Sequence, residues 1–218
     1  MSCQSDSLLL IGAGGHARSV LDIALENGQP VAGCLSPDYP TLRSVPGLEE
    51  IPIIGTDNDL ERLFREGHRK IFVAIGNNRL RGRLYRQALE IGFEPVNLIS
   101  RYARVSRYAR LGRGICVMAG AVINIGCTVS DNVIVNTNSS LDHDCTVGPS
   151  CHIAPGTAVS GGVSIGEGVQ LGTGCSVIDG VSIGAWSFLG AGSVVVSDIP
   201  DHLLAYGVPA KRIQALPR

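Results

Sequence analysis

Three consecutive residues, Asp142, His143 and Asp144, place an imidazole between two carboxylates in a stretch with few other charges. An imidazole can take a proton near neutral pH, and a neighbouring carboxylate can orient the ring and stabilise its protonated form. The triplet therefore suits a general base with an orienting acid. On the residues alone, an exposed polar turn explains it equally well.

The backbone that carries this triplet has a six-residue repeat. Every sixth residue from Ile99 to Val195 is Val, Leu or Ile, at seventeen consecutive positions. This period fits neither an α-helix nor simple strand alternation, but it fits a short strand followed by a corner. Three such units make one 18-residue coil of a triangular parallel β-helix. Leu141 and Val147 keep the register on either side of the triplet, which we therefore place on a corner.

A metal site is the third interpretation of the triplet, because Cys145, Cys151 and His152 follow it closely. The ligands of one ion must converge on it. Cys145 and Cys151 occupy the same repeat position one unit apart, so they face directions a third of a turn apart. The sequence predicts no metal site and treats these cysteines, with Cys127 and Cys175, as small core residues.

The 18-residue period also predicts which residues stack on the triplet. Gly161 and Gly162 lie one coil beyond His143 and Asp144, so we expect an open notch beside the imidazole. Two further columns lack side chains, namely Gly156, Gly174 and Gly192, and Ala154, Gly172 and Gly190. Bare columns would let a thin ligand approach the backbone. Tight corners alone also explain most of these glycines.

The first ninety-eight residues have the pattern of an α/β module. The expected elements are a buried strand in LLLIG, a helix over about 16–27, a strand at Val31–Leu35, a helix near Leu60–Glu66, a strand at Ile71–Ile75 and a helix that begins at Asn77–Asn78. Together these elements form a βαβ arrangement of the half-Rossmann type. The predicted organisation is this α/β module at 1–98, the β-helix at 99–198 and a tail at 199–218.

Gly12, Gly14 and Ala17 match the pattern G-x-G-x-x-A between the first strand and the first helix. Backbone N–H groups at such a helix start suit a phosphate. NAD is disfavoured, because the module is only half a dinucleotide fold. The acidic residue expected after the second strand is also displaced, with Ser36 and Pro37 in its place and Asp38 beyond them.

The composition of the chain limits which partners it can bind and in which cellular compartment it can function. The net charge of −1 argues against a nucleic-acid-binding protein, and the apolar runs are too short to cross a bilayer. Seven cysteines without a CxxC pair argue against a secreted disulfide framework. We expect a soluble, cytoplasmic protein that binds neither nucleic acid nor a membrane.

Over nearly its whole length the chain resembles the bacterial sialic-acid O-acetyltransferase-like family of hexapeptide-repeat acyltransferases. The matching signatures are GAGGHA, AIGNN, DHDC and GVPAKR, together with the repeat [LIV]-G-x-x-x-x. This family includes N-acetyltransferases of nucleotide-linked 4-amino-4,6-dideoxy sugars, such as the bacillosamine-pathway and perosamine enzymes. The resemblance implies a left-handed β-helix and a homotrimer with active sites between subunits and acetyl-CoA in the grooves between its β-helices.

The same resemblance implies roles for individual residues. His143 would be the general base and Asp144 its orienting acid, with Asp142 the less favoured orienter. The nucleotide-linked sugar would contact Gly12, Gly14, Gly15, His16, Asp38, Asn77, Asn78 and Arg81. Acetyl-CoA would contact His152 across the subunit interface, and Gly161, Gly162, Thr173, Ala191 and Lys211.

The expected activity is an acetyl-CoA-dependent N-acetyltransferase of bacterial surface-glycan biosynthesis. It would transfer acetyl directly to the 4-amino group of a UDP- or GDP-linked amino-dideoxy sugar, with no metal and no covalent enzyme intermediate. Two alternatives stay open. One is O-acetylation of a sialic-acid-type sugar hydroxyl, and the other is a non-catalytic trimer that binds sugar nucleotides.

Overall fold

The computed structural model describes residues 6–217. The chain divides into two compact units, Met1–Leu98 and Ile99–Arg218, each with its own hydrophobic core. The junction between the units coincides with Ile99, the residue at which the six-residue repeat begins.

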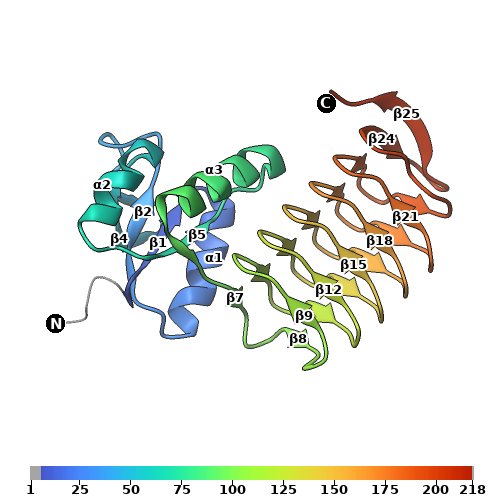
Figure 1. The fold of residues 1–218 in the computed structure, drawn as a ribbon, viewed down its shortest axis with the longest axis horizontal. Helices are drawn as coiled ribbons and strands as arrows, with labels where there is room; N and C mark the ends of the chain where they lie inside the picture. Colours follow the sequence, from blue (N-terminus) through green and yellow to red (C-terminus); the bar gives the residue numbers. More distant parts are fainter. Residues whose placement is uncertain (1–5, 218) are drawn as a thin grey trace. The chain divides into compact units, whose positions relative to one another are not determined.

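The first unit is built on a six-stranded sheet with the order β3-β4-β2-β1-β5-β6 (Figure 1). The strands are β1 (Leu8–Ile11), β2 (Val31–Leu35), β3 (Ser44–Val45), β4 (Leu48–Gly55), β5 (Lys70–Val73) and β6 (Glu94–Pro95). All neighbours pair in parallel except β3 and β4. All four residues of β1 are buried, as expected of a central parallel strand that is covered on both faces.

The helices of this unit are α1 (Gly15–Glu26), the 3₁₀ turn η2 (Asp57–Asp59), α2 (Leu60–Arg65) and α3 (Asn78–Ile91). Side chains of α2 and α3 pack on one face of the sheet against Leu9, Ile11, Ile71 and Val73. The sequence predicts neither the short strand β6 nor the β3–β4 hairpin, which lies in a region, residues 36–59, rich in proline, glycine and charge. No helix within residues 6–217 is long and apolar enough to cross a membrane.

The second unit is a three-sided parallel β-helix whose strands β7 to β23 are each two residues long and recur every six residues (Figure 1). The longer strands β24 and β25 form an antiparallel pair at the end of one of its sheets. One sheet contains β7 (Leu98–Ile99), β10 (Cys116–Val117), β13 (Ile134–Val135), β16 (His152–Ile153), β19 (Gln170–Leu171), β22 (Phe188–Leu189), β24 (Leu203–Tyr206) and β25 (Lys211–Ala215). The second contains β8 (Arg104–Val105), β11 (Val122–Ile123), β14 (Ser140–Leu141), β17 (Ala158–Val159), β20 (Ser176–Val177) and β23 (Val194–Val195). The third contains β9 (Arg110–Leu111), β12 (Thr128–Val129), β15 (Thr146–Val147), β18 (Ser164–Ile165) and β21 (Ser182–Ile183).

The repeat keeps one register from coil to coil. Leu141 pairs with Ile123 on one side and with Val159 on the other, at steps of 18 residues. The aliphatic residues of the repeat form a continuous core inside the helix. The stacking is so close that a Cβ at Gly148 or Gly166 would lie 2.7 Å from backbone nitrogen of the next coil. These glycines are therefore required by packing.

The repeat cysteines lie in this core with no exposed surface, as the sequence predicts. Each thiol donates to a backbone carbonyl fifteen residues further on, at 2.9 Å from Cys127 to Asp142, 3.2 Å from Cys145 to Ser160, 2.9 Å from Cys151 to Gly166 and 3.1 Å from Cys175 to Gly190. These contacts give hydrogen-bond donors to corner carbonyls, of which the Gly190 carbonyl also accepts from Ser193. Buried thiols in this role are not available as nucleophiles.

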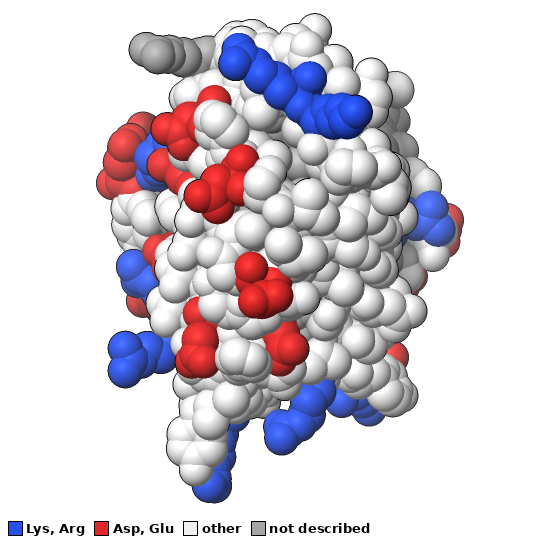
Figure 2. All heavy atoms as spheres, turned by 90° about the vertical axis from the view of Figure 1, so that its right-hand side faces the viewer, with Lys and Arg blue, Asp and Glu red and all other residues white. Residues whose placement is uncertain are grey.

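Charge is distributed unevenly along the β-helix. Exposed arginines surround its first coil, at Arg101, Arg104, Arg107, Arg110 and Arg113. Residues 114–200 then contain no Lys or Arg and only six acidic residues. In the view of Figure 2, acidic side chains stand on an otherwise uncharged surface, and Lys and Arg appear only toward its edges.

Arg104 and Arg110 lie on β8 and β9, which are outer edge strands of their sheets. Charged residues on an open edge discourage pairing with another chain. Replacing both with valine should cause concentration-dependent association in light scattering, with an unchanged far-UV circular dichroism spectrum. Arg83→Val, on the exposed side of α3, is the control. Equal scattering by the double variant and the control would contradict a protective role.

Candidate active site

The Asp142–Asp144 triplet lies at the corner after β14, as the hexad register predicts. The corner is held by backbone bonds to both neighbouring coils. The Asp144 amide donates to the Ile125 carbonyl at 3.0 Å, and the Gly162 amide donates to the His143 carbonyl at 2.9 Å. The triplet is therefore fixed in the ladder while its three side chains face solvent.

Asp144 is bonded directly to the imidazole. Its Oδ2 lies 2.9 Å from His143 Nδ1. The residue has a left-handed backbone, with φ +61°, which an aspartate adopts at modest cost. Its other carboxylate oxygen occupies the place that a Cβ on Gly126 would take, one coil earlier. The glycine at 126 thus makes room for the carboxylate that orients the ring.

Asp142 has a different role at the same corner. Its Oδ1 accepts from the backbone N–H of His143 at 2.8 Å and from Asn124 Nδ2 at 3.1 Å. It holds the backbone, whereas Asp144 holds the ring. The two carboxylates are therefore not equivalent.

The imidazole ring packs against Gly161 of the next coil. A Cβ added there would be 2.5 Å from His143 Cε1 and 2.6 Å from Nε2. The notch predicted at Gly161 is thus filled by the ring itself, and open space remains at Gly162. With Nδ1 bonded to the carboxylate, the lone pair of Nε2 points away from Asp144 and can receive a proton.

The hydrogen bond to Asp144, and then the charge of Asp142, raise the pKa of His143 above that of an isolated imidazole. A base must be neutral to act, so activity should fall in acid through this raised pKa.

Asp144→Asn keeps an acceptor for Nδ1 but removes the charge. We expect the acidic limb of the kcat/KM profile to move to lower pH and the plateau to drop. An unmoved limb would exclude Asp144 as the partner that tunes His143.

The six-residue register predicts a corner for His152, but the residue lies on strand β16, where it is half-buried. Its Nε2 lies 3.0 Å from Nδ2 of Asn136. The amide donates, so this nitrogen accepts and the ring proton lies on Nδ1. Asn136 is a neighbour that the sequence did not single out, although it lies close to one coil before His152.

Thr173 and Ala191 are exposed at the corner that precedes the β14–β17–β20 sheet. Gly156, Gly174 and Gly192 at this corner face open space. The second bare column is filled instead, because a Cβ at Gly172 would lie 2.6 Å from the Ala191 nitrogen and one at Gly190 would lie 2.7 Å from Tyr206 Cβ. Of these two columns, the first faces open space and the second is closed by its stacked neighbours. Lys211 is exposed at the start of β25.

The predicted sugar-nucleotide residues gather at the carboxyl ends of three adjacent strands. Gly12 follows β1, Asp38 follows β2, and Asn77 and Asn78 follow β5. Gly12 has φ +121°, and a Cβ there would be 2.7 Å from the carbonyl oxygen of Ala74. Carboxyl ends of parallel strands are where open α/β sheets bind ligands.

Gly14 and Gly15 form the start of α1, whose first turn has no side-chain cap and no acidic residue. His16 follows them, and burial and then the charge of Arg81 lower its pKa to about 4. Arg81 is 1% exposed, and its Nη1 donates to the carbonyls of Ile75 at 3.0 Å and Gly76 at 3.3 Å. His16 is thus neutral at physiological pH beside a buried cation.

Some of these residues also have structural roles. Asn77 caps α3, with its Oδ1 accepting from the Leu80 amide at 2.9 Å. Asn78 is buried in the first turn of that helix, and Asp38 is exposed beyond the end of β2. Its role as the N-cap of α3 is sufficient to explain an asparagine at position 77, with no ligand contact required.

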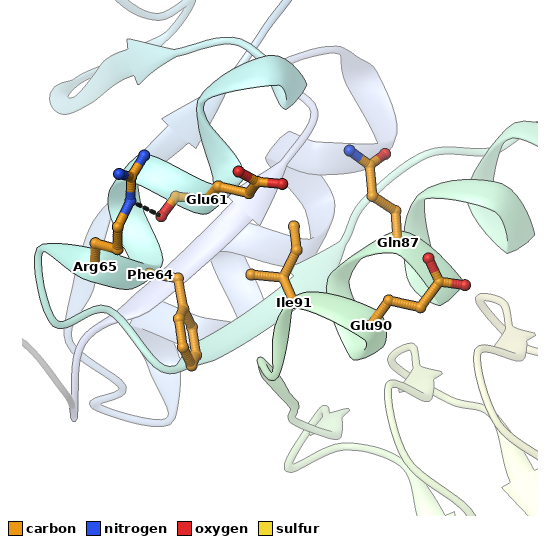
Figure 3. Close-up of a pocket in the computed structure, with 6 residues that line it drawn as sticks. All are labelled: Glu61, Phe64, Arg65, Gln87, Glu90 and Ile91. Carbon is orange, nitrogen blue, oxygen red and sulfur yellow. Dashed lines mark hydrogen bonds between the residues drawn. The ribbon is translucent and has the colours of Figure 1, made fainter.

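Two surface cavities of the first unit, of about 440 Å³ each, differ in their relation to these residues. One is lined by Gly15, Arg18, Ser19, Asp22, Gly47 and Leu48, beside the start of α1. Arg18, which the sequence did not single out, lies there with its guanidinium against Gly47. The other lies between α2 and α3, with Phe64 and Ile91 among charged and polar side chains, and no predicted site residue lines it (Figure 3).

Within the described part of the chain, no three His, Cys, Asp or Glu side chains are placed to share a metal ion. The fold and the His143 corner define an α/β module joined to a hexapeptide-repeat transferase domain. Two family models match accordingly. They are the PglD N-terminal domain over residues 7–88 and the bacterial transferase hexapeptide (six repeats) over residues 162–197. A comparison with curated proteins found no match.

Solved structures resemble the whole chain. PerB from Caulobacter crescentus, in complex with CoA and GDP-perosamine, is 44% identical over 98% of this chain and 100% of its own, with a TM-score of 0.91. The acetyltransferase domain of PglB from Neisseria gonorrhoeae, in complex with acetyl coenzyme A, is 40% identical over 96% of this chain and 100% of its own, with a TM-score of 0.87. WeeI from Acinetobacter baumannii, at 18% identity and a TM-score of 0.86, shares the fold.

This chain therefore belongs to the family of PglD-like hexapeptide-repeat acyltransferases that contains perosamine N-acetyltransferase. The predicted resemblance is confirmed, and so is the fold, an α/β module followed by a left-handed β-helix.

Proposed function

We propose that this protein transfers the acetyl group of acetyl-CoA to the 4-amino group of a nucleotide-linked amino-dideoxy sugar, for bacterial surface-glycan synthesis. The observation that carries the proposal is the exposed imidazole of His143 with Asp144 bonded to Nδ1. The similarity to a protein crystallised with CoA and GDP-perosamine supports the choice of co-substrate and acceptor. We place the reaction in the cytoplasm, where acetyl-CoA and nucleotide sugars are made.

The chain's own residues account for the proton transfer. The amine nitrogen attacks the thioester carbonyl and loses its proton to His143 Nε2, while Asp144 stabilises the resulting imidazolium. The C–N bond forms, the C–S bond breaks, and the CoA thiolate leaves and is protonated. A backbone N–H near Gly161 would meet the oxyanion. The buried thiols of the repeat take no part.

The active site is proposed to lie between subunits of a homotrimer. The His143 corner follows the β14–β17–β20 sheet, whereas Thr173 and Ala191 lie at the corner that precedes it. Five to six extended residues separate two corners of one coil, a span of roughly 15–20 Å. One chain therefore cannot bring its own two corners together around a thioester, but a neighbouring β-helix can supply the second corner.

Turnover of candidate acceptors tests the proposed reaction. UDP-, GDP- and dTDP-linked 4-amino sugars would be incubated with acetyl-CoA, with free thiol release as the readout. We expect at least one amino sugar to be acetylated, and the matched 4-hydroxy sugars to be left unchanged. Turnover of a hydroxyl acceptor without any amino acceptor would overturn N-acetylation in favour of O-acetylation.

Mixed oligomers test the shared site. Light scattering should give a particle of three 22.8 kDa chains. His143→Ala and Ala191→Trp, each inactive alone, should recover activity when co-expressed, because some interfaces then combine an intact base with an intact acetyl-CoA corner. If a confirmed mixed oligomer stays inactive, the base and the acetyl-CoA corner must come from the same chain, and the shared site is wrong.

A further inference from the structure

The corner that lies one coil before the triplet supports it with side chains. Asn124 stacks under Asp142, and Gly126 stacks under Asp144, each at the 18-residue step. The backbone of Asn124 is already held in the ladder, with its amide donating to the Leu141 carbonyl at 3.0 Å. Its side-chain bond is additional to this ladder bond.

That side chain donates instead to Asp142. Asn124 Nδ2 lies 3.1 Å from Oδ1, the same oxygen that accepts from the His143 amide at 2.8 Å. Two donors on one oxygen fix the direction of the carboxylate. Two hydrogen bonds thus connect the Asn124 side chain, through Asp142, to the backbone of His143.

We propose that Asn124 is a positioning residue of the His143 site, which holds the Asp142 carboxylate against the His143 backbone and so fixes the direction of the imidazole. The assignment rests on the proposed function, in which His143 is the base. Asn124 acts through Asp142 and need not touch either substrate.

Few other charges act on the ring. Asp142 and Asp144 flank it on its own corner, the buried Cys127 thiol lies beneath, and Gly161 and Gly162 contribute no side chain from above. Residues 114–200 contain no Lys or Arg that could offset the carboxylates. A displaced Asp142 would therefore change the potential at His143 directly.

The experiment compares Asn124→Ala and Asn124→Asp with the unaltered protein. The titration of the His143 ring is followed by NMR of histidine-labelled protein, with the His143→Asn spectrum to assign the signal among the five histidines. We expect the midpoint to fall with alanine, which frees Asp142 to turn toward solvent. It should rise with aspartate, which adds a negative charge beneath the corner. The acidic limb of the kcat/KM profile should move in the same two directions.

The alanine variant should also lose about threefold to tenfold in kcat, the size expected for one lost hydrogen bond, with KM for acetyl-CoA unchanged. Asn132→Ala is the matched control. It deletes another coil-to-coil bond with the same 18-residue step, Asn132 Nδ2 to Ser150 Oγ at 2.9 Å, at a different corner. The control should lower the melting temperature without moving the His143 titration.

The proposal is overturned if Asn124→Ala titrates like the unaltered protein, or if both Asn124 variants shift the midpoint in the same direction. Should the alanine variant fail to fold, an unmoved midpoint in Asn124→Asp has the same consequence. The NMR titration requires no substrate. It therefore decides the role of Asn124 even if no amino sugar is turned over and the proposed function is wrong.

Discussion

Replacement of His143 by alanine is expected to lower kcat by about 10²–10⁴-fold, the usual contribution of a positioned general base. The affinity for acetyl-CoA should be largely kept, because the ring lies at an exposed corner and supports no core contact. The fold should also be unaffected, since the backbone of residue 143 stays in the ladder through its bond from Gly162. Steady-state kinetics with both substrates varied, together with a thermal melt, measure these effects.

Asp179→Ala provides the control for this variant. Asp179 is exposed at the same corner position two coils further along, so it tests the loss of a polar corner side chain alone. Its kcat should stay within about twofold, as for a surface change that touches no reacting group. Near-normal turnover by His143→Ala would remove the imidazole from the mechanism. Equal losses in the two variants would point to a general effect on the corner.

The second large effect is expected from a single added methyl group. Gly161 does not have a positive φ, so its backbone tolerates alanine, but the new Cβ would lie 2.5 Å from His143 Cε1. The ring must move aside, and a displacement of about 1 Å at a reacting group can cost about 10²-fold in rate. We expect Gly161→Ala to lose activity on this scale and to melt close to the unaltered protein.

Gly162→Ala should show the opposite combination. Gly162 has φ +68° and nothing within 4 Å of a new Cβ, so alanine there is strained but does not clash with the ring. The strain should cost about 1 kcal/mol of stability and leave kcat nearly unchanged, and the loss of an acetyl-CoA contact at Gly162 would raise KM for that substrate. Melting temperatures and kcat for the pair separate the two effects. Full activity in Gly161→Ala would mean that the ring does not act from its position against Gly161.

The β-helix was predictable because its period is long and almost without interruption. Each strand of the ladder contains one of the repeated aliphatic residues, and Leu141 and Val147 placed the triplet at a corner. The same period shows that His143 stacks under Gly161. The period could not show whether the notch beside Gly161 stays open or is filled by the His143 ring. That outcome depends on side-chain direction, and the ring fills the notch at Gly161.

Other features were missed for physical reasons that can be named. The β3–β4 hairpin depends on pairing with β2, a tertiary contact that local pattern does not reveal. Gly172 and Gly190 looked like openings, but stacked neighbours close them. Asn124 could have been found by counting 18 residues back from Asp142 as well as forward.

The fixed step between coils has an evolutionary consequence for the base. Repeat arrays commonly gain or lose whole units, and such a change leaves the ladder of the β-helix intact. Here the loss of residues 145–162 would be one full coil, and it would bring Asp179 over the imidazole where Gly161 now lies. The protein would still fold, but a carboxylate would occupy the place of the ring. Most solenoids can change their number of repeats without losing function. In this enzyme the number of coils beyond His143 is constrained, because it decides which residue stacks on the imidazole.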